Sequence, residues 1–206
     1  PSLEEVQAIW AASFAMGHLW GPYIRLCILT GQRSRSDVLQ MQWGWIDFSR
    51  NRYEIPNPKN GRPHIVHLSD TAIGELQRLK KQQASQTSAF VFTTTGKRAA
   101  SGVSKAKLRL DHFVQKYWTE LGHKSQFQPW VLHDLRRSQA TALAEAGFDE
   151  GVVDRIQNHV ASGSRASAVA AVYNKAQKLT ERAAALDAWA AMVTGRPTNI
   201  LQLREA

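Results

Sequence analysis

Apolar residues recur every three or four positions along most of this chain, which is the spacing of α-helices with one buried face. The first run follows the capping-box pair Ser2 and Glu5 and consists of Leu3, Val6, Ile9, Trp10 and Phe14. Further runs predict helices over residues 22–29, 38–43, 70–79, 103–121, 133–146, 149–156, 164–173 and 180–192. We therefore expect a mainly helical protein.

Local signals mark the ends of several of these helices. Pro22 suits the first turn of the second helix, and Gly31 suits its end. Ser69 precedes the run over 70–79 as a helix cap, and Gly195 suits the end of the last helix. The expected buried face of the helix over 103–121 carries Leu108, Phe113, Tyr117 and Trp118.

Between residues 45 and 68 the helical spacing gives way to short β-like runs. The runs 45–48, 53–55 and 65–68 are separated by turn-rich segments, so they predict a small antiparallel three-stranded sheet. Residues 90–92 form a further short extended piece. The expected fold is α+β: one mainly helical domain over residues 1–195, followed by a C-terminal tail over 196–206.

The charge balance adds an expected partner. Lys and Arg outnumber Asp and Glu by 26 to 17, which gives a formal charge of +9 for 206 residues. Without a long apolar stretch or a basic amphipathic run, this balance favours nucleic acid over a membrane, although some basic proteins have no polyanionic partner. Cys27 is the single cysteine, which fits a reducing compartment and a cytoplasmic location. Because the chain begins at Pro1, not Met, we expect it to be part of a longer protein.

The candidate chemistry lies between His133 and Tyr173. This stretch contains His133-Asp134-Leu135-Arg136, then His159, then Tyr173 in Ala171-Val172-Tyr173-Asn174. Arg offers a planar, permanently charged fork to phosphate oxygens, His can donate a hydrogen bond, and Tyr can form a covalent intermediate. Each residue alone has an ordinary explanation, as a surface cation or a packed core residue. Their order indicates nucleophilic attack on a phosphodiester.

These motifs, together with Leu29-Thr30-Gly31-Gln32-Arg33 and Lys59-Asn60-Gly61-Arg62-Pro63-His64, resemble the catalytic domain of the tyrosine recombinases, the phage-type integrases. The resemblance extends from residue 3 to residue 189. Carried over by position, it implies the catalytic residues Arg33, Lys59, His133, Arg136, His159 and Tyr173. It also implies a double-stranded DNA substrate, a tetramer on DNA, accessory DNA-bending proteins, and an N-terminal DNA-clamping domain outside this chain.

The chain departs from the pattern of the family at two places. Many relatives have Arg-x-x-Glu, whereas Arg33 lies four residues before Asp37 and Arg35 lies two before it, as if one residue were inserted. The Thr-Gly-Gln context favours Arg33, and Arg35 is the alternative. The usual Leu-Gly-His is replaced by Gln157-Asn158-His159, and the loss of Gly is expected to alter the local turn.

The resemblance implies cleavage and rejoining of DNA through a 3′-phosphotyrosine, serving a phage or another mobile element. Fixed cations at Arg33 and Arg136 would stabilise charge on the attacked phosphate, and Lys59 would protonate the leaving 5′ oxygen. His133 and His159 would donate hydrogen bonds or assist proton transfer. No metal, ATP or other cofactor is expected. The alternatives are a type IB topoisomerase-like enzyme and a DNA-binding module without catalysis.

Overall fold

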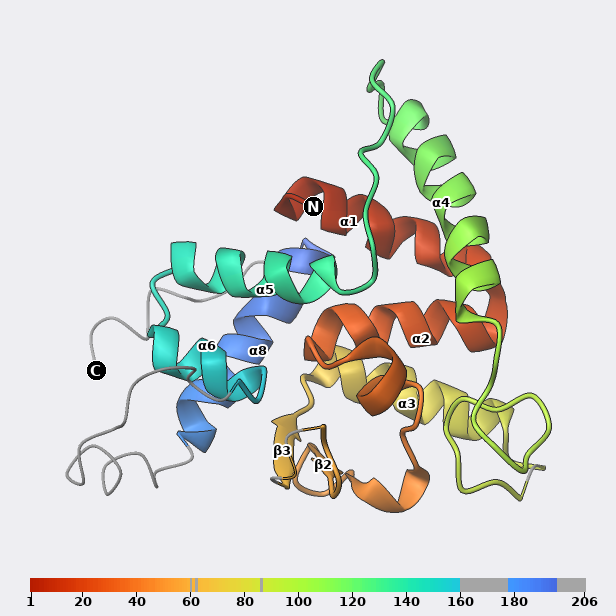
Figure 1. Ribbon diagram of the computed structural model, residues 1–206, viewed down its shortest axis with the longest axis vertical. Coiled ribbons are helices and arrows are strands. Elements are labelled where there is room, and N and C mark those ends of the chain that lie inside the picture. Colours follow the sequence, from red (N-terminus) through yellow and green to blue (C-terminus); the bar gives the residue numbers. More distant parts are fainter. Residues whose placement is uncertain (60, 62, 86, 160–177, 196–206) are drawn as a thin grey trace.

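The computed structural model describes residues 1–59, 61, 63–85, 87–159 and 178–195. The long helices in this part of the chain are α1 Leu3–Ala12, α2 Gly17–Thr30, α3 Asp70–Gln82, α4 Val103–Glu120, α5 Asp134–Glu145, α6 Glu150–Ile156 and α8 Leu179–Thr194. None of them combines the length and the apolar character that a membrane span needs. In Figure 1 α2 runs through the middle of the molecule, with α3 on one side and α1 and α4 on the other.

The small sheet has the predicted topology. Strands β1 Ile46–Asp47, β2 Arg52–Ile55 and β3 His64–His67 pair antiparallel in the order β1-β2-β3. Burial alternates along β2 and β3, so Tyr53, Ile55 and Val66 face the core while their neighbours lie nearer to solvent. The turn between β2 and β3 carries Lys59. The extended piece at 90–92 forms an isolated bridge between Phe90 and Gln42.

The core joins α2 to the C-terminal helix. Trp189 on α8 is fully buried, and its indole nitrogen donates a hydrogen bond to the backbone oxygen of Ile28 at 2.8 Å. Several predicted ends are confirmed, because Ser2 and Glu5 form a reciprocal capping box and Ser69 caps α3. Gly31 and Gly195 end α2 and α8 in the left-handed region.

Four expectations about the helices need correction. Helix α2 begins five residues before Pro22, which lies inside it. Phe14 lies in the short 3-10 helix η1 (Ser13–Met16) and is 54% exposed, with the Arg25 guanidinium over its ring at 4.2 Å. The apolar face of α4 is formed by Val103, Ala106, Leu110, Val114 and Trp118, with Phe113 and Tyr117 partly buried beside it.

Leu108, in contrast, is 71% exposed, so its place on the predicted buried face was wrong. The short helix expected at 38–43 is also wrong. Instead, a π-helical turn η2 (Ser34–Val38) ends where this helix was expected to begin, and a 3-10 turn η3 (Trp43–Trp45) begins where it was expected to end. The helix predicted over 164–173 lies outside the described residues.

Candidate active site

The segment after α2 contains a widened helical turn. Gly31 ends α2 with φ of 62°, and a Cβ at this position would come within 1.9 Å of the Gln139 side chain. In η2 the N–H groups of Val38 and Leu39 bond to the carbonyl oxygens five residues earlier, on Arg33 and Ser34, at 3.0 and 2.9 Å. A π turn is an α turn that holds one more residue. It therefore accommodates the extra residue seen in the Arg33 to Asp37 spacing.

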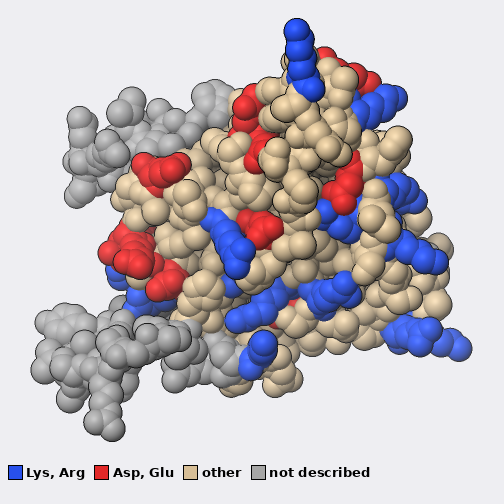
Figure 2. Space-filling model, turned by 45° about the horizontal axis from the view of Figure 1, so that its top comes forward, with Lys and Arg blue, Asp and Glu red and all other residues tan. Residues whose placement is uncertain are grey.

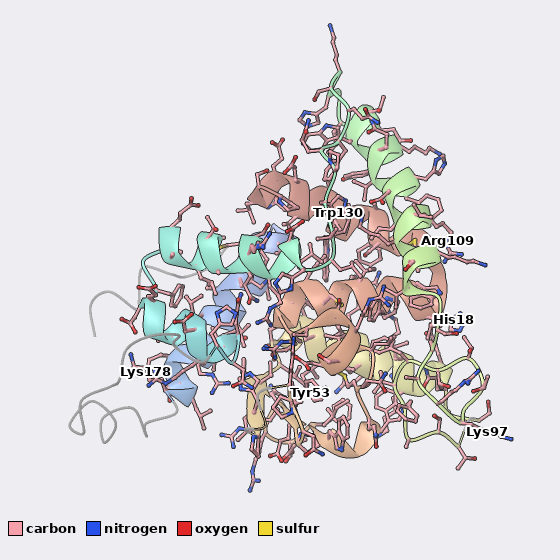
Figure 3. The ribbon with its side chains drawn as sticks, in the orientation of Figure 1. His18, Tyr53, Lys97, Arg109, Trp130 and Lys178 are labelled. Carbon is pink, nitrogen blue, oxygen red and sulfur yellow. The ribbon has the colours of Figure 1, made fainter. Side chains whose placement is uncertain are left out.

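The π turn places Arg33 and Arg35 in different surroundings. Arg33 forms an ion pair with Asp37 at 3.6 Å, and its backbone N–H donates to the same carboxyl oxygen at 3.1 Å. Asp37 is itself buried, and Tyr53 (labelled in Figure 3) donates to its backbone oxygen at 2.6 Å. Arg35 is exposed and donates to Ser104 on α4 at 3.3 Å. A buried carboxylate thus fixes Arg33, whereas Arg35 reaches toward α4.

Arg136 is a buried cation held by the ends of two helices. It is 3% exposed and lies in the first turn of α5. Its Nη1 donates to the backbone oxygen of Gly31 at the end of α2, and its Nη2 donates to that of Gln157 at the end of α6, at 2.8 Å. Carbonyls at helix C-termini lack intrahelical donors and carry partial negative charge, so they suit a buried guanidinium. Burial and the charge of Arg33 lower the pKa of Arg136 to about 10, so it stays charged at neutral pH.

His159 lies directly against Arg136. Its Nε2 is 3.3 Å from Arg136 Nη2, and its Nδ1 is 3.2 Å from a carboxyl oxygen of Asp154. Because a guanidinium can only donate, Nε2 must accept this bond and the proton must lie on Nδ1, facing Asp154. When a phosphate takes the Arg136 donor, Nε2 is released from this contact and can bind another group.

The turn that carries His159 keeps a left-handed residue despite the missing glycine. Asn158 has φ of 52°, and Asn is, after Gly, one of the residues that adopts this region most readily. The side chain of Gln157 is buried and donates to the backbone oxygen of Arg136 at 2.6 Å. The Gln157-Asn158 pair thus gives this turn a residue with positive φ and a side-chain hydrogen bond.

A groove brings the remaining candidates together. It has a volume of about 730 Å³, and it is lined by residues from the π turn, the β2–β3 turn, α4 and the start of α5. Arg33, Lys59 and His133 are among these lining residues. Burial and the charges of Arg136, Arg137 and Arg33 lower the pKa of His133. His133 is therefore mainly neutral near pH 7.

Two donors in this cluster have no hydrogen-bond partner among the described residues. They are Nη1 of Arg33, which lies 3.6 Å from the Asp37 carboxyl oxygen in the ion pair, and Nε of Arg136, and both atoms are buried. Buried guanidinium nitrogens without hydrogen-bond partners are costly, so they indicate a place for an acceptor-rich ligand. A phosphate has oxygens enough for several such donors, and Arg recognises it in a forked geometry.

Comparison with known proteins identifies the family. The model of the phage integrase family matches residues 4–179. The chain belongs to this family of tyrosine recombinases. It is 27% identical over 170 residues to the prophage integrase IntA of Escherichia coli (strain K12), a match that covers 82% of the chain and 37% of that relative.

Solved structures of recombinases show the same fold. The chain superimposes on XerA recombinase with a TM-score of 0.59 and 14% identity, covering 99% of the chain and 61% of XerA. XerH recombinase bound to its difH substrate matches with a TM-score of 0.60 and 18% identity, covering 78% of the chain and 47% of XerH. The lambda integrase catalytic core matches with a TM-score of 0.53 and 16% identity, covering 77% of the chain and 93% of that core. The phage integrase chain thus spans most of a solved catalytic core but about a third of its curated relative.

The structure brings most of the candidates predicted from this family together. Arg33, Lys59, His133, Arg136 and His159 converge from separate segments. Tyr173 lies outside the described residues. Sequence reasoning gave no role to the side chains of Gln157 or Asp154, or to His64, which is buried and bonded to the backbone oxygen of Ile156 at 3.0 Å. Only the unusual Gln157-Asn158 pair was a signal for any of them.

The surface charge is unevenly distributed around this fold. In Figure 2 Lys and Arg side chains form a band across the middle and lower right of the visible face, while Asp and Glu lie at the left, where α5 and α6 are, and also in the centre and upper part. Lys107 on α4 also lies 4.0 Å from the ring centre of Trp130, which Figure 3 labels on the segment before α5. The band of cations suits a polyanionic partner.

Proposed function

We propose that this chain is the catalytic domain of a site-specific DNA recombinase that cleaves and rejoins DNA through a 3′-phosphotyrosine. The Tyr173 oxygen attacks the scissile phosphorus, its bond to phosphorus forms, and the bond to the 5′ oxygen breaks. The tyrosine proton leaves and the departing 5′ oxygen gains a proton, so the strand break is balanced by one new ester. Rejoining by another 5′ hydroxyl is the reverse reaction, which needs neither ATP nor a metal ion.

The observation that carries this proposal is the buried, fixed guanidinium of Arg136. Negative charge grows on the non-bridging oxygens during attack, and preformed cations stabilise that charge without reorganising. Arg136 is held at the ends of α2 and α6 and keeps Nε free of a partner among the described residues, beside Arg33. Such an arrangement fits a tetra- or pentacoordinate phosphate better than it fits a structural ion pair.

The other residues supply protons and hydrogen bonds in this proposal. Lys59 in the β2–β3 turn acts as the general acid for the 5′ oxygen, since an ammonium can give up a proton near neutral pH far more readily than a guanidinium. His133 donates to the phosphate oxygens or assists loss of the Tyr173 proton. His159, whose Nε2 accepts from Arg136, assists loss of that proton, and Asp154 supports this role because its carboxyl oxygen lies 3.2 Å from Nδ1 of His159.

We further propose that the substrate is double-stranded DNA at the attachment sites of a phage or genomic island. The whole protein would assemble as a tetramer on DNA with accessory DNA-bending proteins, and an N-terminal DNA-clamping domain would complete it. The net charge of +9 supports DNA binding, and the family supports strand exchange.

The deciding experiment traps the covalent intermediate. A nicked duplex carrying a candidate attachment site loses a short strand after cleavage, so the adduct cannot religate. Wild-type protein is expected to accumulate adduct, whereas Tyr173→Phe, which lacks only the hydroxyl, is expected to bind DNA and form none. Tyr117→Phe on α4 is the matched control and should react normally. Adduct of full yield from Tyr173→Phe would remove this tyrosine as the nucleophile.

The same preparation separates the two alternatives. A topoisomerase-like enzyme would relax supercoiled plasmid without exchanging strands between paired sites, whereas a recombinase would yield exchanged products. A DNA-binding module without catalysis would shift the duplex in a gel and form no adduct.

A further inference from the structure

Arg136 and Gln157 hold each other through two reciprocal hydrogen bonds. Arg136 Nη2 donates to the backbone oxygen of Gln157 at 2.8 Å, and Gln157 Nε2 donates to the backbone oxygen of Arg136 at 2.6 Å. Both residues are 3% exposed. The two bonds fasten the side chain of Arg136 and its stretch of backbone to one residue. Gln157 therefore restrains the guanidinium and the α5 turn from which it extends.

The second of these bonds depends on the identity of residue 157. Any residue there offers the backbone oxygen that receives Nη2, but an apolar side chain of similar size offers no donor to the oxygen of Arg136. A leucine, which the resemblance implies for many relatives, would keep the bond from Nη2 but lose the bond to the backbone oxygen of Arg136. The amide fixes their relative position with a directional bond.

The same helix end is also fastened to the segment of Arg33. The backbone oxygen of Ile156 accepts from Gln32 Nε2 at 2.8 Å and from His64 Nε2 at 3.0 Å. Gln32 is buried and directly precedes Arg33. The consecutive carbonyls of residues 156 and 157 thus bind the segments that carry the two arginines. The end of α6 sets the position of one guanidinium relative to the other.

From this geometry we infer that Gln157 is a positioning residue, which acts on the phosphate through Arg136. The inference rests on the proposed function. Replacing Gln157 by Leu leaves every charge in place but lets the guanidinium shift relative to the phosphate. Small displacements of a catalytic group reduce rate steeply, so we expect cleavage to slow by about ten- to a hundredfold. The DNA dissociation constant should change by less than about threefold, because phosphate contacts along the duplex dominate affinity.

The test measures single-turnover cleavage of the nicked duplex by wild type, Gln157→Leu and Gln83→Leu. Gln83 is the matched control, since it is also buried and its side-chain amide donates to a backbone oxygen, that of Val91, at 2.9 Å. Gln83 is the C-cap residue of α3, and none of the described hydrogen bonds joins it to Arg33 or Arg136. Gln157→Met, unbranched and without a donor, replaces the leucine variant if that variant does not fold. The expected result is slow cleavage by the Gln157 variants and normal cleavage by Gln83→Leu.

A second substrate distinguishes positioning of Arg136 from a general loss of structure. When a methyl group replaces one non-bridging oxygen of the scissile phosphate, the transition state carries less charge for Arg136 to stabilise. The rate ratio between wild type and Gln157→Leu should then fall toward one. An unchanged ratio on this substrate overturns the inference, as does equal slowing by Gln83→Leu or normal cleavage by Gln157→Leu. If wild type forms no adduct at all, the proposed function fails and the inference fails with it.

Discussion

Substituting His64 by Gln should make the stability of this domain less sensitive to acid. His64 on β3 is 6% exposed and its Nε2 donates to the backbone oxygen of Ile156 at 3.0 Å. Burial, together with the charges of Arg182, Arg136 and Arg33, lowers its pKa from 6.5 to about 4. A proton on this imidazole would be desolvated and would face these guanidinium groups. The folded protein therefore keeps His64 neutral.

The size of the effect follows from the two pKa values. As pH falls through 6.5, the unfolded chain binds a proton at His64, while the folded chain does so only near pH 4. The contribution of His64 to the free energy of unfolding is therefore fully present above about pH 7 and is lost as the pH falls toward 4. A separation of about 2.5 pH units, at about 1.4 kcal/mol each, gives a loss of roughly 3 kcal/mol. For a chain of this size that corresponds to a melting temperature lower by roughly 6–12 °C.

The assay is urea unfolding at a series of pH values between 7.5 and 4. The side chain introduced by His64→Gln keeps an amide donor for the Ile156 oxygen but cannot titrate, so this variant should lose about 3 kcal/mol less than wild type over this range. Other groups titrate in both proteins and cancel in the difference. His112→Gln, which changes an exposed imidazole on α4, is the control and should follow the wild-type curve. A His64→Gln curve as steep as that of wild type would refute the buried, neutral state of His64.

Two further predictions concern cleavage of the nicked duplex. Arg33→Ala should slow adduct formation by about a hundredfold or more, as expected for loss of one transition-state cation, whereas Arg35→Ala should be much milder because that side chain bonds to Ser104; a more severe defect in the Arg35 variant would contradict the π-turn assignment. Lys59→Ala should be slow on normal DNA but largely restored when sulfur replaces the 5′-bridging oxygen, since a thiolate leaves without a proton. Arg136→Ala should not be restored by that substrate, and equal rescue of both variants would exclude Lys59 as the proton donor.

Local interactions in the sequence determined much of this fold. The Ser2–Glu5 capping box and the left-handed Gly31 involve residues close to one another in the chain, so residue type and spacing are sufficient to predict them. The same is true of the three-stranded sheet, whose alternating pattern follows from the period of a strand. The motif residues were also visible, because their order along the chain is itself a signal.

The exposure of Leu108 agrees with its spacing. It lies two residues from both Ala106 and Leu110, and therefore on the side of α4 opposite their buried face, where it lines the groove. Spacing could not predict the form of the inserted residue before Asp37. An extra residue can make a loop or a π turn, and the bonds of Tyr23 to Ser34 and of Tyr53 to Asp37 are available only once the sheet and α2 are packed together.

The tertiary structure alone decided how the arginines are held. Arg136 receives its acceptors from Gly31 and Gln157, which lie 105 and 21 residues away in the chain. The amide of Gln157, which the sequence marked only as a departure, gains its acceptor when α5 and α6 pack. Sequence patterns specify which residues can donate and accept, but hydrogen bonds between distant segments exist only after the helices have assembled. The sequence therefore supplied the chemical groups of the site, and packing determined their geometry.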